Sequence, residues 1–446
     1  MPHLSSARPP PGWQVVVVLV ALGCLPGVAI VDHRAARAVA EFAFLLPFLG
    51  LSIWRLAALF GTRVPPRARR LRGEDLPSYS VLVPLVDEAA ALPGLVAALD
   101  RLDYPRDRLE ILLLLEERDA ATRAAAARLD LPPWFKVLVV PDRPPRTKPK
   151  ALAFGLYVAR GEIIAVYDAE DTPEPLQLQR AAARLVADPR LGCVQASLVI
   201  HNARAGWLAR HFALEYRALF SGLLPRLEAW GAPVPLGGTS NHFPRSTLIA
   251  VGGWDPYNVT EDADLGIRLH RFGYRVGMVA SFTTEEAPTT LSAWLPQRTR
   301  WMKGWMQTWS AHMRNPFRLI DDSGWRGFIL LQIILGAPLL AALVHPLFYL
   351  VALIDIASGS LWSVPTTIPG QVLWALSLFN FFAGYLASLV LTCILARRTG
   401  FRLRVADIVG IPIYWLLISL ATWRALMQLM IDPHTWEKTP HSPRPR

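Results

Sequence analysis

The stretch Thr260-Glu261-Asp262-Ala263-Asp264-Leu265-Gly266 sets several carboxylates directly ahead of an apolar run. The apolar residues of that run recur at helical spacing, namely Leu265, Ile267, Leu269 and Phe272. Further along, Gln297-Arg298-Thr299-Arg300-Trp301-Met302-Lys303-Gly304 places cations and an indole on one short segment. An acid can take a proton, cations can hold an anionic leaving group, and an indole can stack on a sugar face. This combination predicts glycosyl transfer from a nucleotide sugar.

A Thr-Glu-Asp triplet followed by Gln-x-x-Arg-Trp resembles the membrane-embedded family 2 glycosyltransferases, among them the cellulose, chitin, hyaluronan and glucomannan synthases. Both motifs in this order are far more specific than either alone. The resemblance covers roughly Pro77–Pro316. It implies an α/β fold, a GT-A type nucleotide-diphospho-sugar transferase domain, inserted between transmembrane α-helices. It also implies a hexosyltransferase that uses Mg²⁺ or Mn²⁺.

The composition agrees with a membrane protein. The chain has 446 residues, 52% of them hydrophobic, with 16 Trp, which is too apolar for an ordinary soluble protein. The formal charge of +11 is explained by basic loops beside apolar runs, and no basic stripe with interleaved aromatics predicts nucleic-acid binding. The three cysteines lie far apart and indicate neither disulfides nor a metal site, namely Cys24, Cys193 and Cys393.

Two apolar runs precede the catalytic motifs, Trp13–Val31 and Val39–Phe60. Both are long enough to span a bilayer, although a signal peptide is the alternative for the first run. The loop between them holds Arg34 and Arg37, whereas five arginines follow the second run, namely Arg63, Arg67, Arg69, Arg70 and Arg72. This bias favours the later side as cytoplasmic. We therefore expect two transmembrane helices within residues 1–62.

The next region alternates short β-rich runs with helical patterns, as a parallel α/β sheet does. The predicted strands are Tyr79–Leu85, Leu109–Leu115, Phe135–Val140, Glu162–Tyr167 and Gly192–Ile200. The predicted helices are Ala89–Leu102, Ala151–Ala159 and Leu176–Ala187. We assign residues 72–322 to a cytoplasmic catalytic domain with interfacial helices at its end. Its ligands should bind beyond the carboxyl ends of the strands.

Apolar runs return at Gly327–Ile354, Val372–Ala396 and Ile408–Ile431. They predict about three transmembrane helices within residues 326–432, followed by a polar tail at residues 433–446. The last run is ambiguous because Pro412 interrupts it and Arg424 lies inside it. The sequence leaves open whether this run spans the bilayer or re-enters.

The segment Asp168-Ala169-Glu170-Asp171 follows a predicted strand, where two carboxylates could share a divalent cation that also binds a diphosphate. Solvated loop acids are the alternative. In its position the segment resembles the D-x-D motif of the family, which implies that Asp168 contacts both the nucleotide sugar and the metal. The usual second Asp is here Glu170, so the second metal ligand is either Glu170 or Asp171.

Several residues resemble the family's nucleotide-binding positions. Cations ahead of a helix suit phosphate, and of Lys148 and Lys150 we favour Lys150, with a solvated basic loop as the alternative. An acid after the second strand contacts the nucleobase in the family, which here implies Glu116 or Glu117. Arg300 suits the diphosphate because its planar fork binds two oxygens. Gln297 opens the same motif and is assigned to the nucleotide sugar with it.

The acceptor and the base complete the predicted site. Gly238 and Thr239 match the acceptor segment of the synthases, and Trp301 suits stacking on the acceptor sugar, although a turn and helix packing are the alternatives. We predict Asp262 as the general base, with Thr260 and Glu261 in the same catalytic triplet. The alternative is that Asp262 only caps the helix that follows. Direct in-line attack would invert the anomeric configuration.

The sequence thus predicts an inverting, metal-dependent glycosyltransferase of the inner membrane that extends a β-linked polysaccharide from a UDP- or GDP-hexose. Its expected partners are the sugar donor, a glycan or lipid acceptor and the lipid bilayer, and an accessory export subunit is left open. The alternative product is a single sugar on a membrane lipid, as in the ceramide glucosyltransferases. A transporter or scaffold that has lost catalysis is a third interpretation.

Overall fold

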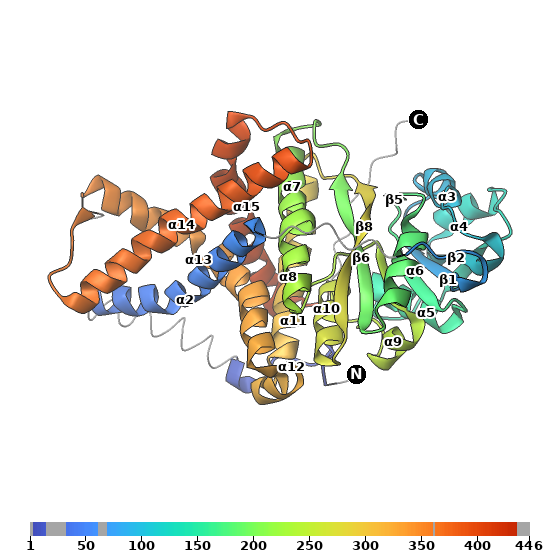
Figure 1. Ribbon diagram of the computed structural model, residues 1–446, viewed down its shortest axis with the longest axis horizontal. Helices are drawn as coiled ribbons and strands as arrows, with labels where there is room; N and C mark the ends of the chain where they lie inside the picture. The colour runs from blue at the N-terminus through green and yellow to red at the C-terminus, as the bar shows by residue number, and fades with distance from the viewer. Residues whose placement is uncertain (1–2, 15–32, 61–68, 360–361, 435–446) are drawn as a thin grey trace.

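The computed structural model describes residues 3–14, 33–60, 69–359 and 362–434. Within these residues the centre is an eight-stranded mixed sheet in the order β3-β2-β1-β4-β7-β6-β8-β5 (Figure 1). The strands are β1 (Tyr79–Leu85), β2 (Leu109–Glu116), β3 (Phe135–Val140), β4 (Ile163–Val166), β5 (Thr172–Pro173), β6 (Leu191–Ile200), β7 (Asn241–Pro244) and β8 (Arg275–Glu285). This α/β architecture is the predicted one.

The first half of the sheet matches the sequence prediction closely. Strand β1 pairs in parallel with β2 and β4, and β2 pairs in parallel with β3. The second half contains strands that the sequence did not predict. Strand β7 lies antiparallel between β4 and β6, and β8 pairs in parallel with β6. The inserted β7 brings residues 237–241 to the carboxyl end of β4, where the predicted D-x-D segment begins.

Ten helices of the described chain surround or follow the sheet. They are α3 (Leu92–Asp100), α4 (Ala120–Ala127), α5 (Lys148–Val158), α6 (Gln177–Ala187), α7 (Trp207–Ala218), α8 (Leu224–Trp230), α9 (Arg245–Ala250), α10 (Glu261–Arg271), α11 (Leu291–His312) and α12 (Pro316–Leu331). A π-helical turn at Leu219–Leu223 joins α7 to α8, and a second at Gln332–Gly336 extends α12. Short 3₁₀ turns lie at Gly73–Asp75 and Arg106–Arg108.

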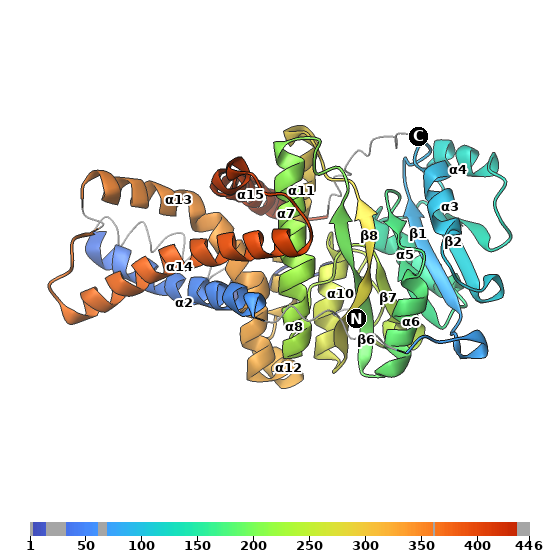
Figure 2. The same cartoon turned by 45° about the horizontal axis from the view of Figure 1, so that its top comes forward.

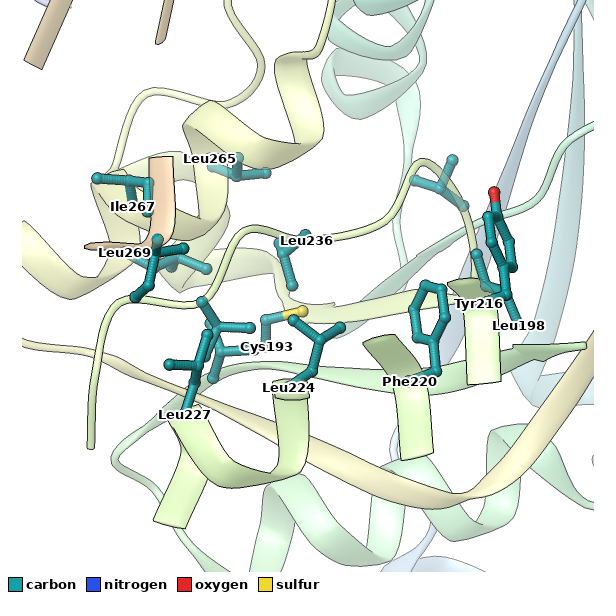
Figure 3. Close-up of a cluster of buried hydrophobic side chains, with 14 of the residues drawn as sticks. Cys193, Leu198, Tyr216, Phe220, Leu224, Leu227, Leu236, Leu265, Ile267 and Leu269 are labelled. Carbon is teal, nitrogen blue, oxygen red and sulfur yellow. The ribbon is translucent and has the colours of Figure 1, made fainter. Parts of the chain in front are cut away.

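The sheet separates two hydrophobic cores. Along β1, Leu82 faces one core and Val81 and Val83 face the other, as the two-residue period of a strand requires. Figure 3 shows the first core at the point where α7, α8 and α10 cover β6, with Phe220, Leu224 and Leu265 among its side chains. Helix α10 is therefore fixed against the sheet by its apolar face. This packing holds the carboxylates of its first turn at the sheet's edge.

Apolar helices complete the described chain: α2 (His33–Leu59), α13 (Ala337–Ala357), α14 (Ile368–Arg398) and α15 (Val405–Ile431). Three helical stretches are long and apolar enough to cross a membrane, at residues 316–347, 368–398 and 405–431. They cover the three predicted C-terminal runs. The second predicted run lies in α2, whose fully described apolar stretch is Leu46–Leu59. The first predicted run, Trp13–Val31, lies outside the described residues from position 15 onward.

The N-terminal residues 3–14 lie against the catalytic domain. The hydroxyl of Ser5 and the backbone N–H of Ser6 donate to the carboxylate of Asp255, over 2.9 Å and 2.6 Å. Arg314, just beyond α11, donates to the carbonyls of His3 and Ser5. This segment is thus bound to the loop that leads into the Thr260 triplet. Figures 1 and 2 show α2, α13 and α14 leaving the domain together on one side.

Candidate active site

Four elements bring their polar side chains together around Gly238. A Cβ atom added to this glycine would lie 3.3 Å from Asp262 Oδ2, 3.7 Å from Lys148 Nζ and 3.8 Å from Asp168 Oδ2. Lys148 Nζ also donates to Asp168 Oδ1 at 2.5 Å and to the Gly238 carbonyl at 2.8 Å. The carboxyl end of β4, the segment before β7 and the first turns of α5 and α10 thus form one centre. A side chain at Gly238 would fill part of it.

The first turn of α10 presents Asp262 to this centre. Helix α10 starts after Thr260, whose side chain makes no capping hydrogen bond within the described residues, and Asp262 Oδ1 accepts from the adjacent N–H of Ala263. Burial raises the pKa of Asp262, although Lys148 and Arg300 lower it in part. Burial, with the charge of Asp262, raises the pKa of Glu261 to about 8. Such shifts are typical of groups that exchange protons near neutral pH.

Arg300 of α11 lies close enough to the acids to interact with all of them. Its guanidinium attracts Glu261, Asp262, Asp168 and Glu170, while burial lowers its own pKa. Lys148 is the second cation of the centre. Burial favours its neutral amine, but Asp168 and Glu261 outweigh that effect and raise its pKa. Two cations therefore lie beside the acidic turn, where a diphosphate could bind both.

The three carboxylates of the turn after β4, at Asp168, Glu170 and Asp171, differ in their exposure to solvent. Asp171 is fully buried, and its Oδ2 accepts from the N–H of Asp168 at 2.7 Å and from the hydroxyl of Thr239. Burial, together with Asp168 and Glu170, raises the pKa of Asp171 well above its usual range. Asp168 and Glu170 are instead partly exposed. Asp171 therefore holds the turn in shape, and Glu170 is the more accessible of the two candidates for the second metal ligand.

A divalent cation fits this arrangement only together with its nucleotide. Within the described ranges, no three His, Cys, Asp or Glu side chains form a group that could hold a metal alone. Mg²⁺ commonly uses one or two carboxylates and completes its shell with substrate phosphates and water. Asp168 and Glu170 are the two carboxylates that suit this role. Thr239 bonds inward to Asp171, so the geometry favours a structural role for it over the predicted acceptor contact.

Glu285 joins the site without having been predicted. It ends β8 and is paired with Ile200 at the end of β6. Burial raises its pKa, and the charges of Asp171 and Glu170 raise it further. The strand-end rule would have indicated this residue if β8 had been recognised. Its strand escaped prediction because small and polar residues interrupt the apolar alternation of Arg275–Glu285.

The predicted nucleotide contacts form a second group at the end of β2. Lys150 Nζ pairs with Glu116 Oε2 at 2.8 Å and donates to the Pro141 carbonyl at 3.1 Å. Glu117 Oε2 accepts from the backbone N–H of Asp142 at 3.0 Å. The two lysines of α5 therefore have different neighbours. Lys148, which the sequence analysis did not favour, is the lysine that touches the D-x-D segment.

Helix α11 carries the predicted Gln297–Trp301 motif along one side of the centre. Trp301 is half-buried, stacks on Tyr216 of α7 with ring centroids 6.3 Å apart, and has the Arg298 guanidinium 4.6 Å from its ring. Gln297 is also half-buried. Gly304 lets α11 approach α10, because a Cβ there would lie 2.3 Å from Thr260 Oγ1. The two motifs are therefore in direct contact.

Sequence comparisons agree with this geometry. The family described as "Glycosyl transferase family group 2" matches residues 163–427, and "Glycosyl transferase family 2" matches residues 80–240. A probable glycosyltransferase, YdaM, from Bacillus subtilis is 30% identical over 235 residues, which are 52% of this chain and 56% of the relative. A beta-monoglucosyldiacylglycerol synthase from Synechocystis is 30% identical over 267 residues, which are 58% of this chain and 55% of the relative.

A probable glucomannan 4-beta-mannosyltransferase 6 from Oryza sativa is 29% identical over 247 residues, 52% of this chain and 42% of the relative. The chain spans about half the length of these curated relatives. Among solved structures, a mannosyltransferase from Pyrobaculum calidifontis in complex with GDP-Man and Mn²⁺ has a similar fold. Its TM-score is 0.54 at 19% identity, covering 92% of this chain and 99% of that one. The fold is thus the predicted GT-A type.

Proposed function

The chain belongs to glycosyl transferase family group 2, and on that premise we propose that it transfers a hexose from a UDP- or GDP-sugar to an acceptor hydroxyl at a membrane. The observation that carries the proposal is the convergence of Asp262, Lys148 and Asp168 at Gly238. A base, a cation and a carboxylate able to bind metal meet there within a few ångströms of a site without a side chain. A substrate hydroxyl and an anomeric carbon could be held together at this point.

In the proposed reaction the acceptor oxygen attacks the anomeric carbon while Asp262 takes the hydroxyl proton. The new bond joins the acceptor oxygen to the anomeric carbon, and the bond from that carbon to the donor phosphate oxygen breaks. The nucleoside diphosphate leaves with the electron pair, and the anomeric configuration inverts. Lys148 and Arg300 bind the diphosphate as its charge increases, and Glu116 with Lys150 contacts the nucleotide.

Asp168 and Glu170 would hold Mg²⁺ or Mn²⁺. When bound, the metal supplies positive charge that stabilises the departing diphosphate. Asp171 and Thr239 keep the two ligating carboxylates in place through the buried hydrogen bonds of the turn. Glu261 stays protonated below its pKa of about 8 and so adds no negative charge beside the diphosphate at neutral pH.

The acceptor is either a growing β-linked polysaccharide or a membrane lipid, and the helices favour the lipid. A polymer needs a polar channel through the bilayer, and three residues within the apolar runs could line one, namely Arg424, Asn380 and His345. His345 instead bonds to the Tyr385 hydroxyl at 2.6 Å and packs against Tyr349 and Trp415. That cluster joins neighbouring helices. Two of the relatives named above, a monoglucosyldiacylglycerol synthase and a glucomannan mannosyltransferase, illustrate the two kinds of acceptor.

The proposed organisation keeps the predicted regions: a helical hairpin at residues 1–62, the catalytic domain at 72–322, membrane helices at 326–432 and a tail at 433–446. Binding of Ser5 and Ser6 to Asp255 supports an N-terminus on the side of the catalytic domain. With the five arginines after α2, this favours a cytoplasmic catalytic domain at an inner membrane. An accessory export subunit would be needed only for a polymer product.

The test uses membrane vesicles containing the protein, a panel of labelled UDP- and GDP-sugars, and Mg²⁺ or Mn²⁺, with Asp262→Asn as the control. Products are separated into high-molecular-weight polymer and solvent-extractable lipid. Label in the lipid fraction supports the lipid acceptor, and label in polymer supports the polysaccharide. Failure to bind any nucleoside diphosphate would contradict catalysis and favour the scaffold interpretation.

A further inference from the structure

Helix α15 is the apolar run whose path the sequence left open. Its 27 residues span about 40 Å, enough to cross the hydrocarbon core of a bilayer, which is about 30 Å thick. A crossing helix would place its two ends on opposite faces of the membrane. Both ends of α15 are instead bound to helices of the catalytic domain, as is its third turn, while Trp415 and Trp423 contact the neighbouring apolar helices.

The first turn of α15 is bound to α7. Arg210 of α7 forms a bidentate ion pair with Asp407, at 2.8 Å and 2.5 Å, and both side chains are buried. His211 lies 3.0 Å from the Asp407 carbonyl. A Cβ added to Gly410 would lie 2.6 Å from the imidazole of His211, so the backbones are in close contact. Helix α7 packs on strand β6 and so belongs to the catalytic domain.

The third turn of α15 is bound to both α7 and α11. Tyr414 donates to Glu215 at 2.8 Å and accepts from Arg298 at 3.0 Å. Arg298 forms a bidentate pair with the same Glu215, at 2.6 Å and 2.5 Å. A buried cluster of charges such as this is costly at the centre of a bilayer. It is well placed where α11 borders the aqueous domain.

The far end of α15 is also bound to α11. Ala425 packs on Met302 and Met306, and just beyond the helix Gln307 donates to the Pro433 carbonyl at 2.8 Å. His434 then lies 3.2 Å from the carbonyl of Tyr257, in the loop before Thr260. The contacts advance along both helices in the same direction. Helix α15 therefore runs lengthwise beside α11, whose arginines and lysine could not cross a membrane themselves.

The face of α15 turned away from α11 is apolar over its whole length. Exposed apolar residues recur at intervals of four and three positions, namely Val409, Ile413, Leu416, Leu420, Trp423 and Met427. The spacing of a helix places them in one stripe. The last turn of α14 and the loop before α15 hold four exposed arginines that suit the phosphates of anionic lipids, namely Arg397, Arg398, Arg402 and Arg404. Trp423 also donates to the Leu343 carbonyl of α13, so the stripe continues onto an apolar membrane helix.

We propose that α15 lies in the plane of the membrane surface, on the side of the catalytic domain, with its exposed stripe inserted in lipid and without crossing the bilayer. Figures 1 and 2 show the contrast: α2, α13 and α14 project from the domain, whereas α15 stays beside α7 and α11. Helix α15 would then lie between the bilayer surface and α11, the helix that carries Arg300 of the active site. This inference does not depend on the proposed reaction.

Cysteine labelling in sealed vesicles tests which side each end of α15 faces. The full chain, with its own three cysteines replaced, receives a single cysteine at Thr399 before α15 or at Asp432 after it. Matched controls are Arg123→Cys on the catalytic domain and Ser363→Cys between α13 and α14. We expect a membrane-impermeant maleimide to label both ends of α15 from the same side as position 123. Labelling of position 432 together with position 363 would overturn the proposal.

A depth measurement tests the same proposal independently of thiol reactivity. Nitroxides at Val409, Leu416 and Met427 report their depth from collisions with oxygen and with a water-soluble nickel chelate. We expect one shallow depth at all three sites. Nitroxides along α14, at Val372, Phe379 and Leu386, should pass through a maximum of depth and serve as the control. A similar maximum along α15 would show that the helix crosses the bilayer.

Discussion

Asp262 and Asp264 belong to the same turn of α10, yet their surroundings differ completely. Two positions of a helix turn a side chain by about 200°, so the two carboxylates face different parts of the molecule. Asp262 faces Gly238 and Lys148 at the edge of the sheet. Asp264 is buried, where Arg268 donates to Oδ2 and His312 of α11 lies 3.0 Å from Oδ1.

The pKa values of the two carboxyl groups move in opposite directions. Burial raises the pKa of Asp262. Burial also opposes ionisation of Asp264, but Arg268 and His312 outweigh it and lower its pKa to about 2. A carboxylate with firm partners stays ionised and holds structure, whereas one with a raised pKa can accept a proton at the pH of the reaction. The comparison supports the proposed role of Asp262 as the general base and a structural role for Asp264 in the same motif.

The largest expected effect is on activity at Asp262. Replacing it by asparagine keeps the shape but removes the base, so we expect transfer to fall by about 10³-fold while the fold is retained. Product formation in vesicles measures the transfer activity, and thermal unfolding in detergent shows whether the fold is retained. Full activity of Asp262→Asn would remove the base from the proposed mechanism.

The matched substitution Asp264→Asn should act on stability instead. It leaves the buried guanidinium of Arg268 and the imidazole of His312 without their anion, which typically costs about 3 kcal/mol. We expect a lower unfolding temperature in detergent and, in the protein that remains folded, substantial activity. An unchanged unfolding temperature would show that the buried ion pair is not structural.

The sequence assigned a catalytic role to Asp262, which stays a prediction, and assigned no role to Asp264. The Thr-Glu-Asp triplet and Gln-x-x-Arg-Trp indicated the base because their order is specific. Nothing local marked Asp264, since one partner, His312, lies 48 positions away on another helix. The fold shows the same limit. Strands β1 and β3 were predicted to the residue from β-rich runs, whereas the short, polar β7 is a strand only because β4 and β6 pair with it.

Lys148 extends the comparison from the acids to their cationic partners. Lys148→Met removes a cation from Asp168 and Gly238, and we expect kcat/KM to fall by about 10²-fold. The unfolding temperature should change little, because the carboxylate left behind on Asp168 is partly exposed and can be solvated. Arg268→Met should behave in the opposite way, because Arg268 binds Asp264 and the carbonyls of Val251 and Gly253.

Lys150→Met is the control within the same helix. Because Lys150 pairs with Glu116, we expect its loss to raise the KM for the donor more than it lowers kcat. Steady-state kinetics with varied donor concentration separates the two lysines. Equal effects on kcat at both positions would mean that the lysines share one role. The sequence could not choose between them, because the choice depends on which way each side chain of α5 points.

The smallest expected effect is that of Glu261 on the pH dependence of stability. Its carboxyl has an ordinary pKa of 4.5, which burial and Asp262 raise to about 8 in the folded protein. Between these values the folded state keeps a proton that the unfolded state has lost, so rising pH favours unfolding. The slope is at most about 1.4 kcal/mol per pH unit in that window. The stabilisation is complete below pH 4.5 and is lost by about pH 8.

Glu261→Gln mimics the protonated carboxyl at every pH. We therefore expect the variant to lose this part of the pH dependence of stability, and to keep its activity above pH 8, where the ionised wild-type side chain would repel the donor diphosphate. Unfolding temperatures and donor KM values from pH 6 to 9 measure both effects. Asp264→Asn is the control, because the Asp264 carboxyl that it replaces has a pKa of about 2 and is ionised throughout this range. If the wild type and Glu261→Gln show the same dependence of unfolding temperature and donor KM on pH, the group that titrates near neutral pH is not Glu261. Asp262 is still present in this variant, so its activity should still fall at low pH as the Asp262 carboxylate becomes protonated. The pH dependence at low pH therefore reports on the proposed base separately from Glu261.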